Sequence, residues 1–290
     1  MDSLEKTFVA LARQLVRDVL PMILEAVAAD SRNPSLKGDG SFVTETDLAV
    51  EHRFIARLRS AFPALPILAE EGVEAGSHMK DGDPVAFYEP FMRHPQQIVI
   101  DPIDGTKNFV EGRREFCVAA ALTHSVGTGV WPAAGVVALP AKGVMYWTEG
   151  VKVFREDLAS DRVEEIVRCP APDKRISVSS KDRQWLEAHA FEMKLPWVSA
   201  GSSVHDFLGT ATGDLCGSLV GKQRLWDVMA PLAIALRLGC NLRDLQTGEV
   251  VSSLAPTDLS RDLLHRPWGI ERKMVLAPCD STLTDLVAPR

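Results

Sequence analysis

The chain has 290 residues, of which 46% are hydrophobic and 24% are charged, proportions that are ordinary for a soluble globular protein. This length is sufficient for a sizeable core, in one large domain or in two smaller domains that share an interface. A net charge of -7 and a sequence pI of about 5.6 argue against bulk electrostatic binding to nucleic acid or to acidic membranes.

The cysteines and the apolar runs indicate the compartment. Five cysteines are scattered along the chain without any CxxC spacing, which is typical of reduced thiols and not of a zinc site or a disulfide framework. No apolar run approaches the ~20 residues needed to span a bilayer, and the first residues, MDSLEKTF, do not resemble a signal peptide. We therefore expect a cytoplasmic protein without a membrane span.

Two amphipathic helices are predicted at the start of the chain. Apolar residues recur every three or four positions over residues 3–29, and Pro21 within this pattern should kink or split the helix. After a polar loop at 30–40, a second helix is predicted to run to about Phe62. Asp47 lies where an N-cap residue is expected, so capping alone would explain this aspartate.

A short apolar strand at 66–69 leads directly into two acids, Glu70 and Glu71. Adjacent acids usually belong to a solvated loop, but these two follow an apolar run without any spacer. The polar and charged residues 73–95 then predict a mobile surface loop.

The most informative stretch is IVIDPIDGTKNF, residues 98–109. Its first three residues read as a buried strand. Pro102 cannot donate to a sheet ladder, so we predict that the strand stops at Asp101 and turns. Asp101 and Asp104 would then lie at the carboxyl end of a strand, where open α/β sheets tend to bind ligands.

The residues after Asp104 add features that suit a phosphate. Gly105 lets the backbone come close to a ligand, and a helix that begins near Thr106 would point free N–H groups at it. Two carboxylates beside a phosphate require cations, which favours a Mg²⁺ site that binds a phosphate ester. An ordinary Asp/Gly turn after a core strand explains the short motif equally well when the motif is taken alone.

The rest of the chain predicts a run of strands followed by alternating strands and helices. The first run is expected at 116–123, 130–139, 143–148 and 151–154. Charged and proline-containing residues from 155 to 174 mark a boundary between an N-terminal α+β subdomain (1–160) and a C-terminal α/β subdomain (161–290). In the second part we expect strands at 176–179, 197–198, 215–220 and near 240 and 274, helices at 182–193, 201–212 and 226–238, and a short terminal helix.

Four features occur together in one order: Asp47, the Glu70-Glu71 pair, the Asp101/Asp104 motif and Trp226-Asp227 at the start of a helix. This combination resembles the inositol monophosphatase family, whose Mg²⁺-dependent, lithium-sensitive superfamily includes fructose-1,6-bisphosphatases and 3'(2'),5'-bisphosphate nucleotidases. The resemblance covers roughly residues 5–280. The signature Asp-Pro-Ile-Asp-Gly-Thr-x-Asn-Phe is complete at 101–109, whereas the second signature, at 226–239, is matched more loosely. The resemblance implies an α+β fold built as a layered αβαβα sandwich, and a homodimer.

The resemblance also implies a role for individual residues. Metal binding is implied for the side chains of Glu70, Asp101, Asp104 and Asp227 and for the backbone carbonyl of Ile103. Activation of the attacking water is implied for Thr106 acting with Glu70 and Asp47. Phosphate binding by N–H groups is implied for Gly105 and Thr106, and substrate selection for Gly201, Ser202, Ser203 and the segment that contains Lys222. Two or three Mg²⁺ ions would then promote direct attack by water on the ester, without a covalent phospho-enzyme.

The substrate is less well determined. Inositol monophosphatases usually carry a glutamate seven residues before the aspartate of Trp-Asp, and this chain has Val220 there, followed by the basic residues Lys222 and Arg224. We therefore expect a small phosphorylated polyol or metabolite, with histidinol phosphate or a 3'(2'),5'-bisphosphate nucleotide as alternatives. For Lys222 and Arg224 a solvated basic turn is at least as good an explanation as contact with substrate.

Two other interpretations stay open. An enzyme of the haloacid-dehalogenase type also has an aspartate motif after a strand, but there one residue separates the two aspartates, whereas Asp101 and Asp104 are separated by two. An inactive homologue with a regulatory or scaffold role is the other, although every acidic position of the family is intact in this chain.

Overall fold

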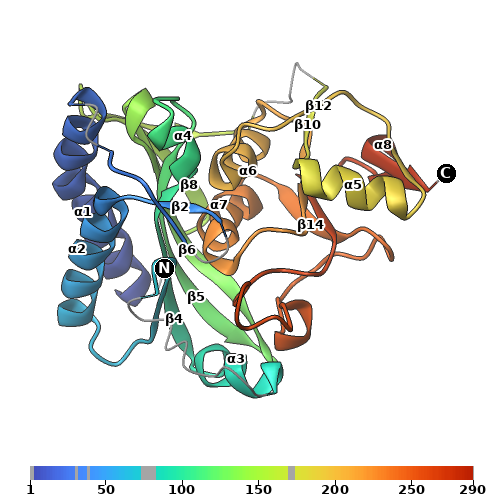
Figure 1. Ribbon diagram of the computed structural model, residues 1–290, viewed down its shortest axis with the longest axis horizontal. Helices are drawn as coiled ribbons and strands as arrows, with labels where there is room; N and C mark the ends of the chain where they lie inside the picture. Colours follow the sequence, from blue (N-terminus) through green and yellow to red (C-terminus); the bar gives the residue numbers. More distant parts are fainter. Residues whose placement is uncertain (1–2, 30–31, 38–39, 73–82, 169–173, 290) are drawn as a thin grey trace.

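Residues 3–29, 32–37, 40–72, 83–168 and 174–289 are described by the computed structural model, and over these residues the fold consists of alternating layers of helices and sheets. Figure 1 shows these layers in the order helix, sheet, helix, sheet, helix. The predicted α+β class and the layered αβαβα sandwich are therefore confirmed.

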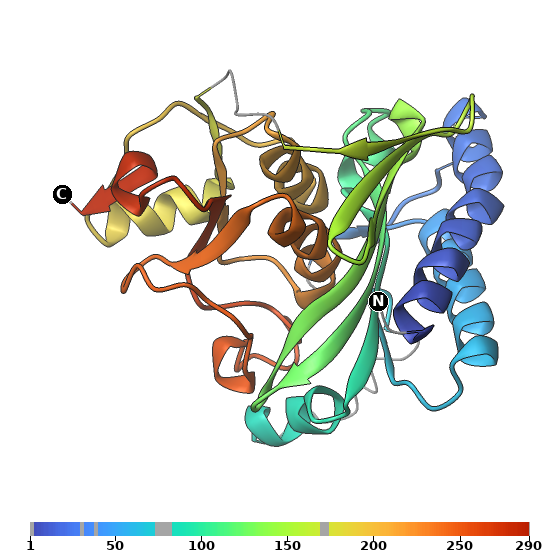
Figure 2. The same ribbon diagram turned by 180° about the vertical axis from the view of Figure 1, so that it is seen from behind.

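The first two layers are a helix pair and a large sheet. Helices α1 (Ser3–Ala28) and α2 (Glu45–Ala61) cover one face of the sheet (Figure 2). Among the described residues this sheet has seven strands, in spatial order β3-β4-β5-β6-β7-β8-β9. Their bounds are β3 (Ile67–Ala69), β4 (Gln96–Asp104), β5 (Cys117–Val126), β6 (Gly129–Leu139), β7 (Val144–Glu149), β8 (Lys152–Asp157) and β9 (Arg162–Ile166). Only the β3–β4 pair is parallel within this sheet.

The remaining layers come from the second half of the chain. Helices α6 (Ser203–Thr212) and α7 (Leu225–Arg237) lie between the large sheet and a second sheet with strand order β12-β10-β13-β15-β14. The strands of this second sheet are β10 (Ile176–Ser177), β12 (Trp197–Val198), β13 (Gly217–Val220), β14 (Cys240–Asp244) and β15 (Met274–Pro278). Helices α5 (Ser180–Ala188) and α8 (Leu283–Leu286) form the outer layer.

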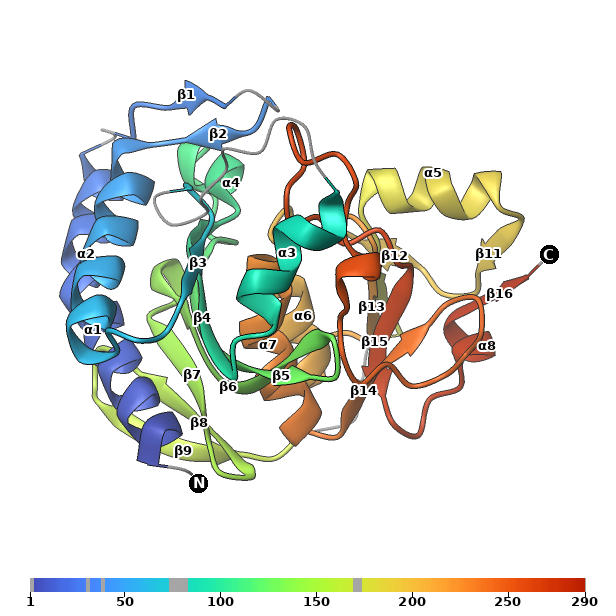
Figure 3. The same ribbon diagram turned by 90° about the horizontal axis from the view of Figure 1, so that it is seen from below.

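Short elements complete the described fold. Two small antiparallel pairs are β1 (Ser35–Leu36) with β2 (Phe42–Val43) and β11 (Phe191–Met193) with β16 (Val287–Pro289). The short helices are α3 (Pro84–Met92), α4 (Thr106–Val110) and the 3-10 turns η1 (Pro140–Lys142) and η2 (Pro256–Asp258). Figure 3 shows α3 beside the segment that contains η2.

Side-chain alternation along the strands explains why both faces of the large sheet are covered. In β4, Ile98 and Ile100 pack into the cluster under α1 and α2, whereas Val99 packs into the cluster around α6 and α7. Because successive side chains of a strand point to opposite faces, a continuous apolar run supplies both cores at once. None of the described helices combines the length and the apolar character that a bilayer span requires.

The structure corrects two predictions about prolines. Helix α1 continues through Pro21 as one helix, so the predicted split is wrong. Strand β4 does not stop at Asp101 but continues to Asp104, with an irregularity in its pairing to β5 between these two residues. Pro102 lies in that irregularity, where no ladder hydrogen bond has to be donated.

Three segments of secondary structure were also mispredicted. Within the predicted loop 73–95, residues 73–82 lie outside the described part, but residues 84–92 form α3, capped by the Asp83 side chain and begun by Pro84. Strand β9, which was not predicted, lies within the segment 155–174 and pairs with β8. Helix α5 ends at Ala188, and residues 191–193 pair with β16 instead of continuing the helix. The division into subdomains 1–160 and 161–290 stays a prediction.

Candidate metal centre

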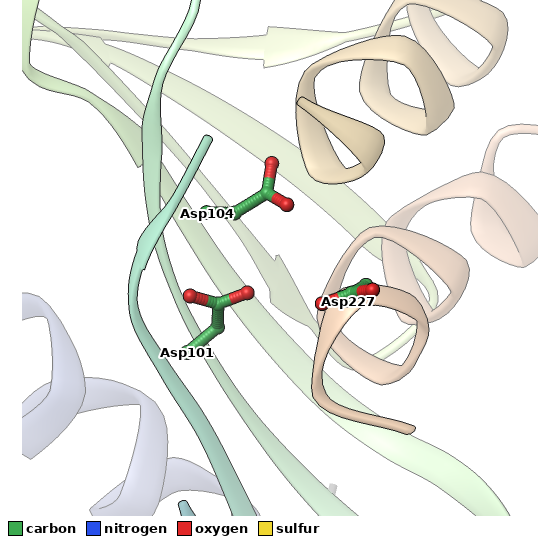
Figure 4. Close-up of side chains that lie close together, drawn as sticks. All are labelled: Asp101, Asp104 and Asp227. Atoms are coloured by element: carbon green, nitrogen blue, oxygen red, sulfur yellow. The ribbon is translucent and has the colours of Figure 1, made fainter. Parts of the chain in front are cut away.

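Three aspartates from distant parts of the chain meet in the described structure. Asp101 and Asp104 come from the end of β4, and Asp227 comes from the first turn of α7 (Figure 4). One carboxylate oxygen from each lies within 4.8 Å of the others. Asp101 and Asp104 are buried and Asp227 is half-buried. Like charges this close repel strongly at low dielectric, so the cluster requires either protons or a cation.

Hydrogen bonds at the start of a helix orient two of the three carboxylates. Asp104 Oδ2 accepts hydrogen bonds from the Ser202 hydroxyl and from the Val204 N–H, at 3.0 Å, in the first turn of α6. Asp227 Oδ2 accepts from the Arg224 N–H at 2.8 Å and so caps its own helix. Both aspartates thus carry out a helix-capping function as well as contributing to the cluster.

Asp101 differs from its neighbours because it has no such partners. In the described part of the chain, neither of its carboxylate oxygens has a hydrogen-bond partner, and both are buried. An unpaired buried carboxylate is strongly unfavourable unless it is neutralised or binds a cation. Because only carboxylate oxygens converge here, the donor set fits a hard divalent cation such as Mg²⁺.

Burial and the neighbouring negative charges raise the pKa of all three aspartates. Burial, reinforced by Glu70, Asp104 and Asp227, raises the pKa of Asp101 well above its ordinary value. Burial and the Glu70 charge raise the pKa of Asp227 to about 7. Burial and Asp227 likewise raise the pKa of Asp104. Without a cation, burial and mutual repulsion therefore favour the protonated form of these three carboxyl groups.

Glu70 lies beside this cluster, because β3 runs parallel to β4 with Ala69 opposite Ile100. Its carboxylate has a partner that sequence reasoning missed: Lys37 Nζ lies 2.9 Å from Glu70 Oε1 and 2.7 Å from Glu71 Oε1. Burial alone would lower the pKa of Lys37, but the two glutamates outweigh it and raise that pKa. Lys37 belongs to a polar loop in the sequence, and nothing in its spacing indicated this contact.

Asp47 is brought to Thr106 by the start of α2. The predicted N-cap role is wrong: Thr44 is the N-cap, and Asp47 is the third helical residue, whose Oδ2 accepts from the Thr44 N–H at 2.9 Å. Asp47 Oδ1 lies 3.0 Å from Thr106 Oγ1, which is also 3.0 Å from the Ile103 carbonyl oxygen. Burial is the main reason that the pKa of Asp47 is raised to about 6. The arrangement is a capping box, with Asp47 reaching back to the cap.

Gly105 allows two segments to approach each other closely. Its φ is 83°, and a Cβ atom there would lie 2.9 Å from the Glu115 carbonyl oxygen and 3.0 Å from Ser202 Cβ. Asn108 joins the same two segments, since its Nδ2 donates to Glu115 O at 2.6 Å and to Ala200 O at 2.7 Å. The role of Asn108 was not predicted, although it belongs to the signature at 101–109.

The residues predicted to contact substrate lie beside the cluster or on a nearby turn. Gly201, Ser202 and Ser203 line a cavity of about 220 Å³ that also contains Gln223 and further serines. Lys222 is exposed on the turn before α7. Val220 is buried in the core around α6 and α7 and presents no polar group. A larger cavity, of about 760 Å³, contains none of the predicted site residues.

Known proteins resemble this chain over most of its length. A model of the inositol monophosphatase family matches residues 4–277. Over 234 residues the chain is 28% identical to the 3'(2'),5'-bisphosphate nucleotidase CysQ of Salmonella typhimurium, a match that covers 80% of this chain and 89% of that protein.

Solved structures show the same fold. The Thermotoga maritima IMPase matches with a TM-score of 0.65 at 19% identity, over 93% of this chain and 92% of that one. An IMPase/NADP phosphatase complexed with Mg²⁺ and phosphate matches with a TM-score of 0.61 at 15% identity, over 96% and 92%. Since the family model spans almost the whole chain, the predicted resemblance is confirmed, and the chain belongs to the inositol monophosphatase family, a family of Mg²⁺-dependent phosphatases.

Proposed function

We propose that this protein is a Mg²⁺-dependent phosphomonoesterase that hydrolyses a small phosphorylated polyol or metabolite by direct attack of water. The observation that carries the proposal is the buried, unpaired carboxylate of Asp101 within reach of Asp104 and Asp227. Membership of the family supports the same reaction class.

The proposed metal ligands are the side chains of Glu70, Asp101, Asp104 and Asp227 and the carbonyl oxygen of Ile103. When bound at these oxygens, two or three Mg²⁺ ions would neutralise the charge of the ester, lower the pKa of the attacking water and stabilise the leaving alkoxide. Lys37 would keep one positive charge beside Glu70, which limits the repulsion between Glu70 and the other carboxylates.

The proposed proton path runs through Thr106 and Asp47. A threonine hydroxyl that donates to Asp47 Oδ1 still has lone pairs and can accept a hydrogen bond from the attacking water. Asp47, with a pKa of about 6, is suited to draw the proton away at neutral pH, and Glu70 would orient the same water. By family resemblance, the N–H groups of Gly105 and Thr106 would hold the phosphate.

A bisphosphorylated substrate is a second candidate within the same reaction class. The 28% identity to a 3'(2'),5'-bisphosphate nucleotidase favours it, and so does the positive charge of Lys222, which is exposed on the turn after Val220. We propose that Gly201, Ser202, Ser203 and Lys222 select among such esters. The homodimer and the cytoplasmic location stay predictions.

The test is release of inorganic phosphate from a panel of esters, with Mg²⁺ and with excess chelator. We expect turnover with Mg²⁺ and none with chelator, because clustered carboxylates repel a phosphate dianion. Full turnover in chelator would refute the proposal. A trapped aspartyl-phosphate would instead indicate haloacid-dehalogenase chemistry, and no turnover with any ester would favour an inactive homologue.

A further inference from the structure

The segment 265–270 lies outside every motif that defines the family signature, yet its backbone is strained where it packs against the start of α7. Trp268 has a φ of 61°, in the left-handed region that a bulky residue rarely adopts. Its side chain is buried, with 4% exposed. Such a conformation persists only where the surrounding contacts impose it, and it occurs preferentially at functional sites.

In this conformation both the carbonyl group and the N–H group of Trp268 form hydrogen bonds. Its carbonyl oxygen accepts from the Leu225 N–H at 3.0 Å, and its N–H donates to the Tyr88 hydroxyl oxygen at 3.3 Å. Leu225 is the first residue of α7, and its N–H has no acceptor within the helix. The Trp268 carbonyl therefore supplies a missing partner two residues before Asp227.

An aromatic cluster holds Trp268 in place. Its ring centroid lies 4.7 Å from that of Tyr88, 5.1 Å from that of Phe91 and 5.9 Å from that of Phe87, all three on α3. The Tyr88 hydroxyl donates onward to the Ser260 carbonyl at 2.7 Å. Tyr88 is completely buried, so this hydroxyl satisfies two backbone groups that water cannot reach.

The segment 265–270 also forms hydrogen bonds with residues 223 and 224, in the turn before Asp227. The Arg224 guanidinium donates to the Pro267 carbonyl at 3.0 Å, and the Ile270 N–H donates to the Gln223 carbonyl at 2.8 Å. Arg224 also donates its own N–H to Asp227 Oδ2. The position of the Asp227 carboxylate thus depends on the backbone of residues 223–225. That backbone is fixed by hydrogen bonds to residues 267–270, which in turn pack against α3.

We propose that Tyr88 and Trp268 are positioning residues for Asp227, which set its distance to Asp101 and Asp104 and thereby the affinity of the metal centre. This inference rests on the proposed function, because it assumes that the three aspartates bind the cation. Groups that orient a metal ligand from behind contribute measurably to metal affinity although they never touch the ion.

The sharpest test is Tyr88→Phe, which removes one oxygen atom and leaves the Trp268 N–H and the Ser260 carbonyl unpaired. We expect the Kd for Mg²⁺, measured by calorimetry without substrate, to rise roughly three- to tenfold. Turnover at saturating Mg²⁺ should stay within about twofold of the parent, since the residues around the water are untouched. Trp268→Phe, which shrinks the ring, should raise the Kd in the same direction and replaces the first variant if that one does not fold.

Two matched controls separate positioning from general stability. Tyr146→Phe removes the hydroxyl of the only other tyrosine in the chain, on β7, and Ile23→Val loosens the core under α1. Both should leave the Kd for Mg²⁺ unchanged even if they lower the Tm. A Tyr88→Phe variant that binds Mg²⁺ as tightly as the parent overturns this inference but leaves the proposed function intact. A parent protein that binds no Mg²⁺ at all refutes the proposed function, and the inference with it.

Discussion

Thr106 Oγ1 lies 3.0 Å from Asp47 Oδ1, although the two residues are 59 positions apart in the chain. Asp47 is held by the first turn of α2, and Thr106 begins α4 directly after Gly105. The contact therefore joins a helix on one face of the large sheet to the end of β4, where Asp101 and Asp104 lie. It supplies a hydroxyl and a proton acceptor beside the proposed metal ligands.

Thr106→Ala should lower kcat by roughly a hundredfold or more while changing the Kd for Mg²⁺ little, because the hydroxyl is proposed to position water and not to bind metal. Thr106→Ser keeps the hydroxyl and should retain most of the rate. Steady-state kinetics together with calorimetry distinguish the two effects. An alanine variant with the parent rate would exclude Thr106 from the proton path.

Asp227→Asn should abolish turnover while leaving the metal-free fold intact or slightly more stable. The amide cannot carry the charge that binds a cation, but it also removes one charge from a repelling cluster. Asp104→Asn should behave alike in turnover. Denaturant melts in chelator and phosphate release at saturating Mg²⁺ are the measurements, and parent-like turnover would show that the residue is not a ligand.

The metal-free protein should lose stability as the pH rises. The pKa of Asp227 is raised from 3.8 to about 7, because burial disfavours the charged form. Between these two pH values the folded protein keeps a proton that the unfolded chain has already released. The contribution of Asp227 to stability is therefore fully present below about pH 4 and is lost as the pH rises through about 7. Glu71, with a pKa raised to about 8 mainly by burial, extends this window upward.

Chemical denaturation in chelator at pH 5 and pH 8 measures this effect. The parent should be less stable at pH 8, the Asp227→Asn variant should show a shallower dependence, and added Mg²⁺ should restore the parent at pH 8. A parent that is equally stable at both pH values in chelator would contradict the raised pKa.

Lithium should inhibit turnover in the millimolar range, as the family resemblance implies, by occupying one of the proposed metal positions. Raising Mg²⁺ at fixed Li⁺, with Na⁺ at equal ionic strength as the control, tests whether the two ions act at one centre. Turnover that is insensitive to Li⁺ would count against the assigned ligand set.

Substrate discrimination among polyol monophosphates should be weak. Val220 lies in the apolar core and offers no acid to grip hydroxyl groups. A lost charged hydrogen bond is worth roughly 1.5–3 kcal/mol. Selectivity for inositol-1-phosphate should therefore be roughly one to two orders of magnitude lower than in a family member with a glutamate at this position. The measurement is kcat/KM for inositol-1-phosphate, histidinol phosphate, fructose-1,6-bisphosphate and adenosine 3',5'-bisphosphate.

Lys222→Ala should reduce kcat/KM most for the substrates with a second anionic group, if Lys222 contacts them as proposed. Lys152→Ala, an exposed lysine on β8, is the matched control and should change none of the ratios. An unchanged profile in Lys222→Ala would leave that lysine as a surface charge. A strong and unique preference of the parent for inositol-1-phosphate would refute the interpretation of Val220.

Much of the fold was predictable because it depends on local patterns. The apolar run that ends in Asp101 indicated a buried strand, and the run before Glu70 indicated another with acids at the same end. The helices that begin at Ser203 and Leu225 were predicted within a residue or two, since apolar periodicity and small or polar residues at their starts are local features. The family resemblance also depends on these contiguous motifs.

The remaining features depend on contacts between residues far apart in the chain. No local pattern indicates that Lys37 meets Glu70, or that Trp268 supplies the acceptor for the first N–H of α7. Pro102 was expected to end its strand, but pairing of Asp104 with Cys117 on β5 resumes the ladder beyond it. In each case the stabilising contact is made with a residue that lies far away in the sequence and comes close only on folding. A local sequence pattern carries no information about that residue.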